Sequence, residues 1–126
     1  MIKLKTFGGF MAGNDITSVQ EGAWRSEKLE KLFVYLAMNR NRGVCIEDIS
    51  EAIWQLDEDT DNPVGALKNL AYRLRKALRD ASFDEECIVS VRGGLYKWND
   101  DVEVSIDVEE FDRYINEAEF AFSRSK

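Results

Sequence analysis

The sequence contains no histidine, and this absence removes the commonest general base and the commonest metal ligand. Cysteine occurs only at Cys45 and Cys87, which is too few for a disulfide framework, and no Cys-x-x-Cys pair suggests a zinc site. We therefore expect two buried free thiols, with no bound metal and no cofactor.

Catalytic motifs are also lacking. The sequence has no P-loop, no G-x-G-x-x-G and no G-x-S-x-G, and its glycine pairs, Gly8-Gly9 and Gly93-Gly94, are typical of turns. Its carboxylates lie in charged runs, where we expect no apolar surroundings to raise a pKa. These features predict that the chain is not an enzyme.

Long apolar runs are missing as well. No segment approaches the roughly 18 consecutive apolar residues that a membrane-spanning helix needs. The first residues, Met1–Thr6, alternate like a strand and lack the apolar stretch of a signal peptide. We expect a cytoplasmic protein with no membrane partner.

The 126 residues carry a net charge of −7, and this charge is unevenly distributed. Residues 1–63 have a balance of −4 and residues 99–126 a balance of −6, whereas residues 64–98 have a balance of +3. An overall negative charge opposes binding to phosphate, but screening limits this repulsion to about 8 Å at physiological salt. A local basic surface can therefore still bind nucleic acid.

The basic segment has the pattern of a helix. Between Val64 and Arg79 it contains five basic residues and no acidic one. The only proline, Pro63, is well placed at the first helical position. The apolar residues recur at the helical period, which defines one buried stripe: Leu67, Leu70, Ala71, Leu74 and Leu78.

The other elements follow from periodicity and turn residues. Residues 2–20 predict short strands, and residues 101–106 predict one more. Ser26 is expected to cap a first helix, and Glu47 and Asp48 to open a second one that ends at Trp54. Two sets of apolar residues are expected to face inward from these helices: Leu29, Leu32, Phe33, Leu36 and Ala37 from the first, and Ile49, Ala52 and Ile53 from the second.

Two glycines at the centre of residues 87–98 predict a β-hairpin. Asp107 and Glu110 form a capping box for a last helix, whose apolar face would contain Phe111, Tyr114, Ile115, Ala118 and Phe122. The expected fold class is α+β. It combines a small N-terminal antiparallel sheet, a three-helix core, a C-terminal hairpin and an extra C-terminal helix.

From residue 25 to residue 98 the chain resembles the DNA-binding domain of SARP-type bacterial transcriptional activators, a branch of the OmpR/PhoB-type winged helix-turn-helix proteins. The resemblance rests on four stretches: Arg25-Ser-Glu-Lys-Leu-Glu-Lys-Leu, Ile49-Ser-Glu-Ala-Ile-Trp54, Ala66-Leu67 with Tyr72-Arg-Leu-Arg-Lys-Ala-Leu78, and Arg92-Gly-Gly-Leu-Tyr-Lys-Trp98. It implies a winged-helix domain over residues 1–106. Residues 107–126 resemble the start of the bacterial transcriptional activator domain, a helical-repeat module.

The resemblance implies sequence-directed binding to double-stranded DNA, with helix 64–79 in the major groove and hairpin 87–98 as the wing. Tyr96 and Trp98 are expected in the core. The chain departs from the family at Gly65, where a polar residue is frequent, and at Leu95, where glycine is frequent. The expected DNA-binding residues are Lys68, Asn69, Tyr72, Arg73, Lys76, Arg79, Arg92 and Lys97.

The acidic loop before the basic helix has two further interpretations. Its carboxylates, Asp57, Glu58, Asp59 and Asp61, partly match a calcium loop. Asn62 and Lys68 stand where that loop needs glycine and glutamate, so we expect no calcium. In the resembled family the loop can contact RNA polymerase.

Two alternatives stay open at this point. The domain could serve protein–protein interaction without DNA, with its acidic surface and last helix as the working faces. The apolar face of that helix needs a cover, which a homodimer partner or a further C-terminal domain of a longer regulator would supply.

Overall fold

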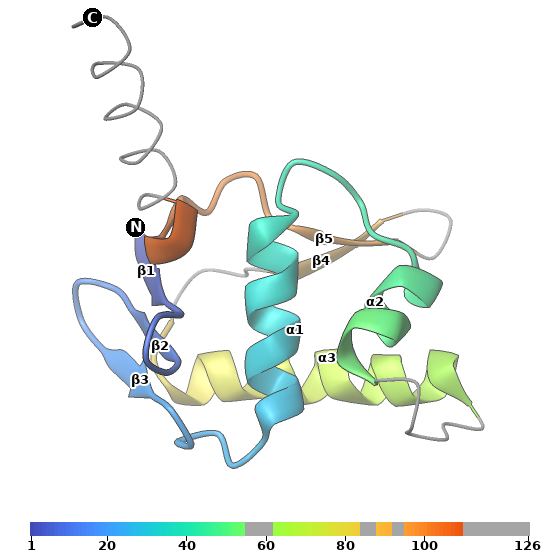
Figure 1. Ribbon diagram of the computed structural model, residues 1–126, viewed down its shortest axis with the longest axis horizontal. Coiled ribbons are helices and arrows are strands. Elements are labelled where there is room, and N and C mark those ends of the chain that lie inside the picture. Colours follow the sequence, from blue (N-terminus) through green and yellow to red (C-terminus); the bar gives the residue numbers. More distant parts are fainter. Residues whose placement is uncertain (55–61, 84–87, 92–94, 110–126) are drawn as a thin grey trace, which may run out of the picture.

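The computed structural model describes residues 1–54, 62–83, 88–91 and 95–109, and its elements have the predicted order (Figure 1). Strands β1 (Ile2–Lys5), β2 (Met11–Gly13) and β3 (Ser18–Gln20) precede helices α1 (Glu27–Met38), α2 (Ile46–Ile53) and α3 (Pro63–Asp80). Strands β4 (Ile88–Val91), β5 (Leu95–Trp98) and β6 (Val104–Ile106) follow. The predicted α+β class is confirmed. None of the helices in these ranges is long and apolar enough to cross a membrane.

The N-terminal sheet has four strands in the order β3-β2-β1-β6. The first three strands are antiparallel, as predicted, but β6 pairs in parallel with β1, so the sheet is mixed. Ile2 and Leu4 of β1 are buried and alternate with exposed lysines, because successive side chains of a strand point to opposite faces. The sheet therefore covers the helical core with one apolar face.

The three helices bury the apolar residues that periodicity predicted on α1 and α3. Ser26 caps α1, since its hydroxyl accepts a hydrogen bond from the N–H of Leu29 at 3.3 Å. In α2 Ile49 and Ile53 are buried, but Ala52 is exposed, so its predicted inward position is wrong. Ala52 lies about 60° around the helix from Ile49, at the edge of the apolar face.

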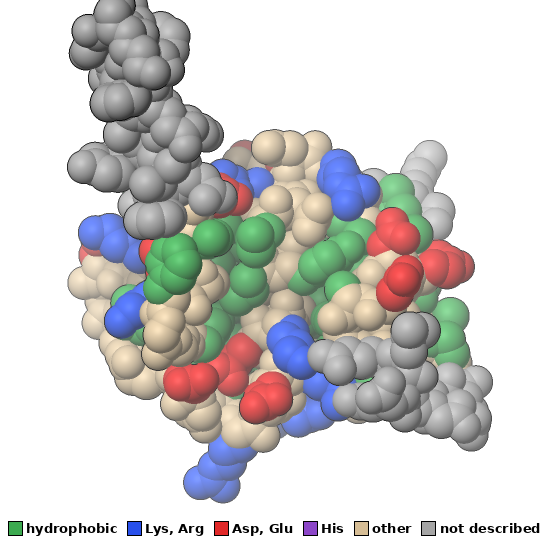
Figure 2. Space-filling view, viewed as in Figure 1, with side chains coloured by type: hydrophobic (Ala, Val, Ile, Leu, Met, Phe, Trp, Pro, Cys, Tyr) green, Lys and Arg blue, Asp and Glu red, His purple; other side chains and the backbone are tan. Residues whose placement is uncertain are grey.

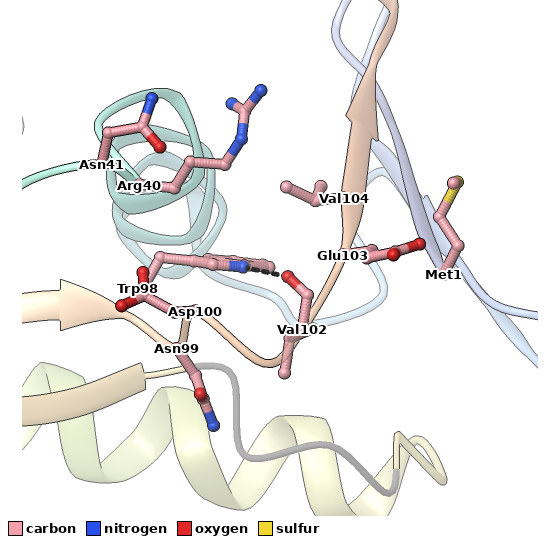
Figure 3. A pocket seen from close by; sticks show the side chains of 9 residues that line it. All are labelled: Met1, Arg40, Asn41, Trp98, Asn99, Asp100, Val102, Glu103 and Val104. Carbon is pink, nitrogen blue, oxygen red and sulfur yellow. Dashed lines mark hydrogen bonds between the residues drawn. The ribbon is translucent and has the colours of Figure 1, made fainter.

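A chain of aromatic rings joins the sheet region, α1 and the hairpin. Phe33 of α1 stacks on Trp98 of β5, with ring centroids 5.3 Å apart and an interplanar angle of 14°. Trp24 stacks on the same phenylalanine at 5.6 Å, and Phe10 lies 5.3 Å from Trp24. The indole N–H of Trp98 donates to the carbonyl of Val102 at 2.8 Å (Figure 3). Tyr96 and Trp98 are both buried, which confirms their predicted place in the core.

The hairpin of β4 and β5 is fixed to the helical core by backbone hydrogen bonds. Val44, just before α2, pairs with Tyr96, and their N–H and carbonyl groups exchange hydrogen bonds of 2.7 and 2.9 Å. The next residue, Cys45, is a free thiol that is only half-buried, so the predicted burial is wrong there. Cys87 lies outside the described residues.

The carboxylate of Asp107 joins the end of β6 to the end of β1. It accepts hydrogen bonds from the N–H groups of Thr6 and Phe7, at 2.9–3.0 Å, and from the Thr6 hydroxyl at 2.7 Å. Helical conformation begins at Asp107, and the Val108 N–H donates to the same carboxylate at 2.8 Å. Glu110, the other residue of the predicted capping box, lies outside the described residues.

These hydrogen bonds allow the ionised form of Asp107 to stabilise the fold. Burial alone would raise the pKa of this carboxyl, but the donors on Phe7, Thr6 and Val108 together lower it. Because the pKa is lowered in the folded state, the ionised Asp107 stabilises the fold at pH values above the ordinary aspartate pKa of about 3.9. This contribution is lost as the pH falls through the folded-state pKa.

We therefore expect Asp107→Asn to lower the free energy of unfolding at neutral pH by about 2 kcal/mol, because an amide cannot replace both accepting oxygens. The difference from wild type should shrink as the pH falls through the folded-state pKa, since the wild-type carboxyl then becomes protonated too. Urea unfolding at neutral pH and at an acid pH well below the ordinary aspartate value of about 3.9 measures this. Asp15→Asn, in an exposed turn, is the control and should change neither value. An equal loss at both pH values would contradict the charge-based explanation.

Candidate nucleic-acid interface

Helix α3 separates its apolar and basic residues onto opposite faces. Its buried residues are the predicted leucines and Ala71, which pack toward α1 and α2. At 100° per residue the candidate DNA-binding positions from Lys68 to Arg79 share an arc of about 140°, centred opposite the buried stripe. The structure exposes every one of them: Lys68, Asn69, Tyr72, Arg73, Lys76 and Arg79.

The charge of this face is uniformly positive along most of the helix. No acidic residue occurs on α3 before Asp80, its last residue, and Arg79 lies in the last turn. Tyr72 is 61% exposed, so its ring is accessible on this face. Arg75 is half-buried at the edge of the apolar stripe. Asp80 lies on the same face, four residues after Lys76, so a carboxylate of α3 joins the face only in its last turn. Before that turn the face can contact phosphate without a repelling carboxylate of the helix beside it.

The start of α3 explains the glycine at position 65. Asn62 caps the helix, since its side-chain oxygen accepts a hydrogen bond from the Gly65 N–H at 3.1 Å. A Cβ at position 65 would lie 2.7 Å from the amide nitrogen of Asn62. The side chain of Asn62 thus occupies the space where the resembled family usually has a polar side chain at position 65.

Only part of the predicted wing lies within the described residues. Its strands are present, but Arg92 and the two glycines at its tip lie outside the described residues. The ammonium group of Lys97 forms an ion pair of 2.6 Å with the carboxylate of Asp100, whose side chain is 69% exposed. Such exposed pairs contribute about 0–1 kcal/mol, so DNA phosphate could displace Asp100 at little cost.

Several predicted features have no structural description. The acidic loop residues, Asp57, Glu58, Asp59 and Asp61, and the apolar residues of the last helix lie outside the described ranges. Within those ranges no group of three acidic or cysteine side chains is arranged to hold a metal ion.

A hollow of about 320 Å³ lies between the end of α1 and the connection from β5 to β6 (Figure 3). Arg40 is its basic side chain. The Arg40 guanidinium already donates to both carboxylate oxygens of Glu109, at 2.7 and 3.0 Å, and to the carbonyl of Ala37 at 3.0 Å. Because the Arg40 guanidinium is already hydrogen-bonded to these acceptors, this hollow is a weak candidate for binding phosphate.

One carboxylate on α1 is buried, which the sequence pattern did not predict. Glu30 is only 9% exposed, and burial raises its pKa, with the carboxylates of Glu21 and Glu27 adding to the effect against a hydrogen bond from the Gly22 N–H. The expectation that no carboxylate has apolar surroundings is therefore wrong. It lies between Lys28 and Lys31 in the sequence, and the apolar side chains near it, such as Phe10 and Ile53, come together only in the fold.

These elements define a winged helix: three helices with an exposed basic third helix, followed by a hairpin. Known proteins agree with this class. A family model described as "Transcriptional regulatory protein, C terminal" matches residues 21–98, and the chain belongs to this family. No curated protein gives a significant match. The family is one of DNA-binding domains of transcriptional regulators and not a class of enzymes, which confirms the resemblance to OmpR/PhoB-type domains.

Two solved structures have a similar fold. One is EmbR of Mycobacterium tuberculosis in complex with a low-affinity phosphopeptide, with a TM-score of 0.60 and 20% identity over 78% of this chain. The other is the DNA-binding domain of CadC of E. coli, with a TM-score of 0.55 and 18% identity over 71% of this chain and 78% of that one. This chain spans a quarter of the EmbR chain, since the match covers 25% of it. Identities this low show the fold alone.

The packing of Asn62 against Gly65 predicts that the two positions are energetically coupled. Alanine is better than glycine inside a helix by up to about 1 kcal/mol, and removing an asparagine cap costs about 1 kcal/mol. Gly65→Ala should be about neutral in the wild type, because the new methyl group displaces the Asn62 cap. In an Asn62→Ala background it should stabilise the protein by about 1 kcal/mol. Urea unfolding of the four proteins measures this coupling, and additive effects would contradict it.

Proposed function

We propose that the chain binds double-stranded DNA in a sequence-directed way, with residues 64–79 of α3 in the major groove and hairpin 87–98 as a wing along the DNA backbone. The observation that carries this proposal is the exposed basic arc of α3, which has no acidic residue before Asp80. A helix in the major groove needs such a face, because its flanks approach phosphates on both sides.

The residues of the arc have distinct proposed roles. Asn69 can pair with the edge of adenine through two hydrogen bonds, and Lys68 or Arg73 can contact guanine or phosphate. Lys76 and Arg79 lie further along the helix and neutralise phosphates. Tyr72 lies between Lys68 and Lys76 and adds apolar contact. Arg92 and Lys97 extend the same role to the wing.

The charge distribution sets the expected affinity. The chain is acidic overall, at −7, so the long-range field does not attract DNA. One domain with about four to six phosphate contacts would bind weakly and lose affinity steeply with salt. Binding of several copies to tandem sites would increase the affinity.

Three further proposals concern partners. We place the end of the DNA-binding domain at residue 106 and the start of a helical-repeat domain at residue 107. The acidic loop, residues 57–61, would contact RNA polymerase. The last helix would be covered by that further domain or by a second copy of the chain. The alternative, a winged helix used only for protein contact, does not need the basic arc of α3.

Removing single cations from the arc tests the proposed groove contact. Arg73→Ala and Lys76→Ala should each weaken binding to random duplex DNA at low salt without lowering the melting temperature. Each should also reduce the slope of log affinity against log salt by about one, as expected for one lost phosphate contact. Fluorescence anisotropy measures both quantities. Lys31→Ala, on α1, removes the same charge from another face and should leave the slope unchanged. Unchanged binding in both α3 variants would contradict the assignment.

The proposed readout by Asn69 has a separate test. In vitro selection of duplexes should give a preferred site for the wild type, and Asn69→Ala should relax the preference at one adenine position by about 1–3 kcal/mol. Binding to random duplex should change little, because a base contact contributes nothing to non-specific affinity. Lys76→Ala serves as the opposite control, with uniform weakening and an unchanged preference. An unchanged preference in Asn69→Ala would show that this side chain does not read bases.

A further inference from the structure

An apolar groove lies along α1, on the side of the molecule away from α3. Its volume is about 500 Å³, and it is lined by residues from the β1–β2 loop, the segment after β3, α1 and α2. We call it the α1 groove. Its apolar lining is contributed chiefly by Phe10, Val34, Tyr35, Met38, Ala52 and Ile53. Figure 2 shows hydrophobic side chains on both sides of α1 on this face, with acidic side chains near the N-terminal end of the helix.

The position of the groove keeps it separate from the proposed DNA interface. In the view of Figure 1, α1 crosses in front of α3. Because α3 packs its buried face toward α1 and α2, its basic arc points away from them. A protein bound in the α1 groove would therefore leave the basic arc accessible.

Three charged side chains give the groove a defined chemistry. Glu30 lines it and is almost completely buried, Glu21 lines it from the segment after β3, and Lys31 lines it from α1. The carboxylate of Glu21 lies against Gly9, since one of its oxygens is 2.8 Å from the place a Cβ would take there. Within the described part of the chain, Lys31 forms no ion pair with either carboxylate. Two carboxylates against one ammonium group leave the groove with a negative charge balance among apolar side chains, which attracts a cation that brings its own apolar surroundings.

We propose that the α1 groove binds a protein segment that places one lysine or arginine between apolar side chains. The cation would lie between Glu21 and Glu30, and the neighbouring apolar side chains would cover Phe10, Tyr35 and Met38. Met38 is 47% exposed, and its flexible thioether suits a surface that adapts to a partner. The chemistry indicates a helix or strand with a basic residue at the centre of an apolar face.

The stability of Glu30 variants separates binding from folding. Burial raises the Glu30 pKa, which means that the folded protein disfavours the ionised form more than the unfolded chain does. The ionised carboxylate therefore lowers the stability of the fold at neutral pH. Glu30→Gln should therefore melt at a temperature equal to or higher than the wild type at pH 7. The difference should shrink below about pH 4, where the wild-type side chain is neutral too. A variant that folds at least as well but binds less must have lost a binding interaction.

Selection of short random peptides on the whole chain, by mRNA display, tests the proposal. The enriched peptides should carry lysine or arginine flanked by apolar residues. They should bind Glu30→Gln about tenfold more weakly than the wild type, which is the loss expected for one charged hydrogen bond. Met38→Lys should also weaken binding, because it removes an apolar contact and its ammonium group repels the cation of the peptide. Ile16→Lys makes the same apolar-to-basic change at a residue that is 76% exposed and outside the groove, and it should bind like the wild type.

Three outcomes would overturn the proposal. They are enriched peptides that lack a basic residue, peptides that bind Glu30→Gln or Met38→Lys as tightly as the wild type, and the absence of any enriched sequence. The melting temperature of each variant is measured in parallel, so that a loss of binding is attributed to the groove only where the protein is folded. None of these measurements involves DNA, and their result is independent of the proposed role of α3.

Discussion

The stacking of Phe33 on Trp98 is the contact on which the arrangement of the domain depends. Both rings are almost fully buried, and each belongs to a different part of the winged helix. Through Trp24 and Phe10 the stack continues toward the N-terminal sheet. Buried aromatic side chains of this kind contribute about 3–5 kcal/mol each. One continuous apolar contact therefore holds together the hairpin, α1 and the segments that flank the sheet. Helix α3 is oriented because it packs against α1, the helix at the centre of this contact.

The sequence allowed most of the fold to be predicted, and the reasons for the exceptions are physical. The leucines of α3 repeat at the helical period, so its buried face is visible without a structure. The strand at residues 104–106 was also predictable, but its parallel pairing with β1 was not, because hydrophobic alternation carries no information about the partner strand. Glu30 lies between lysines in sequence, and its burial and its hydrogen bond with the Gly22 N–H exist only in the folded chain. The basic arc could be listed from the sequence, whereas the α1 groove is formed by four separate segments.

The fold also reconciles an acidic protein with a basic working face. Packed helix axes are about 8–10 Å apart, and the Debye length at physiological salt is about 8 Å. Carboxylates on elements packed behind α3 are thus separated from its arc by more than one screening length. The arc can therefore keep a local positive charge in a chain that is acidic overall. The net charge of the chain describes its solubility better than its binding.

The fit of Asn62 against Gly65 has a consequence for how the domain can change over evolution. A single substitution that adds a side chain at position 65 displaces the helix cap, and a single substitution of Asn62 removes it. Once the cap at position 62 is lost, an alanine at position 65 restores about as much stability as the cap contributed. The two positions are therefore expected to vary together, whereas the exposed positions from Lys68 onward can vary one at a time.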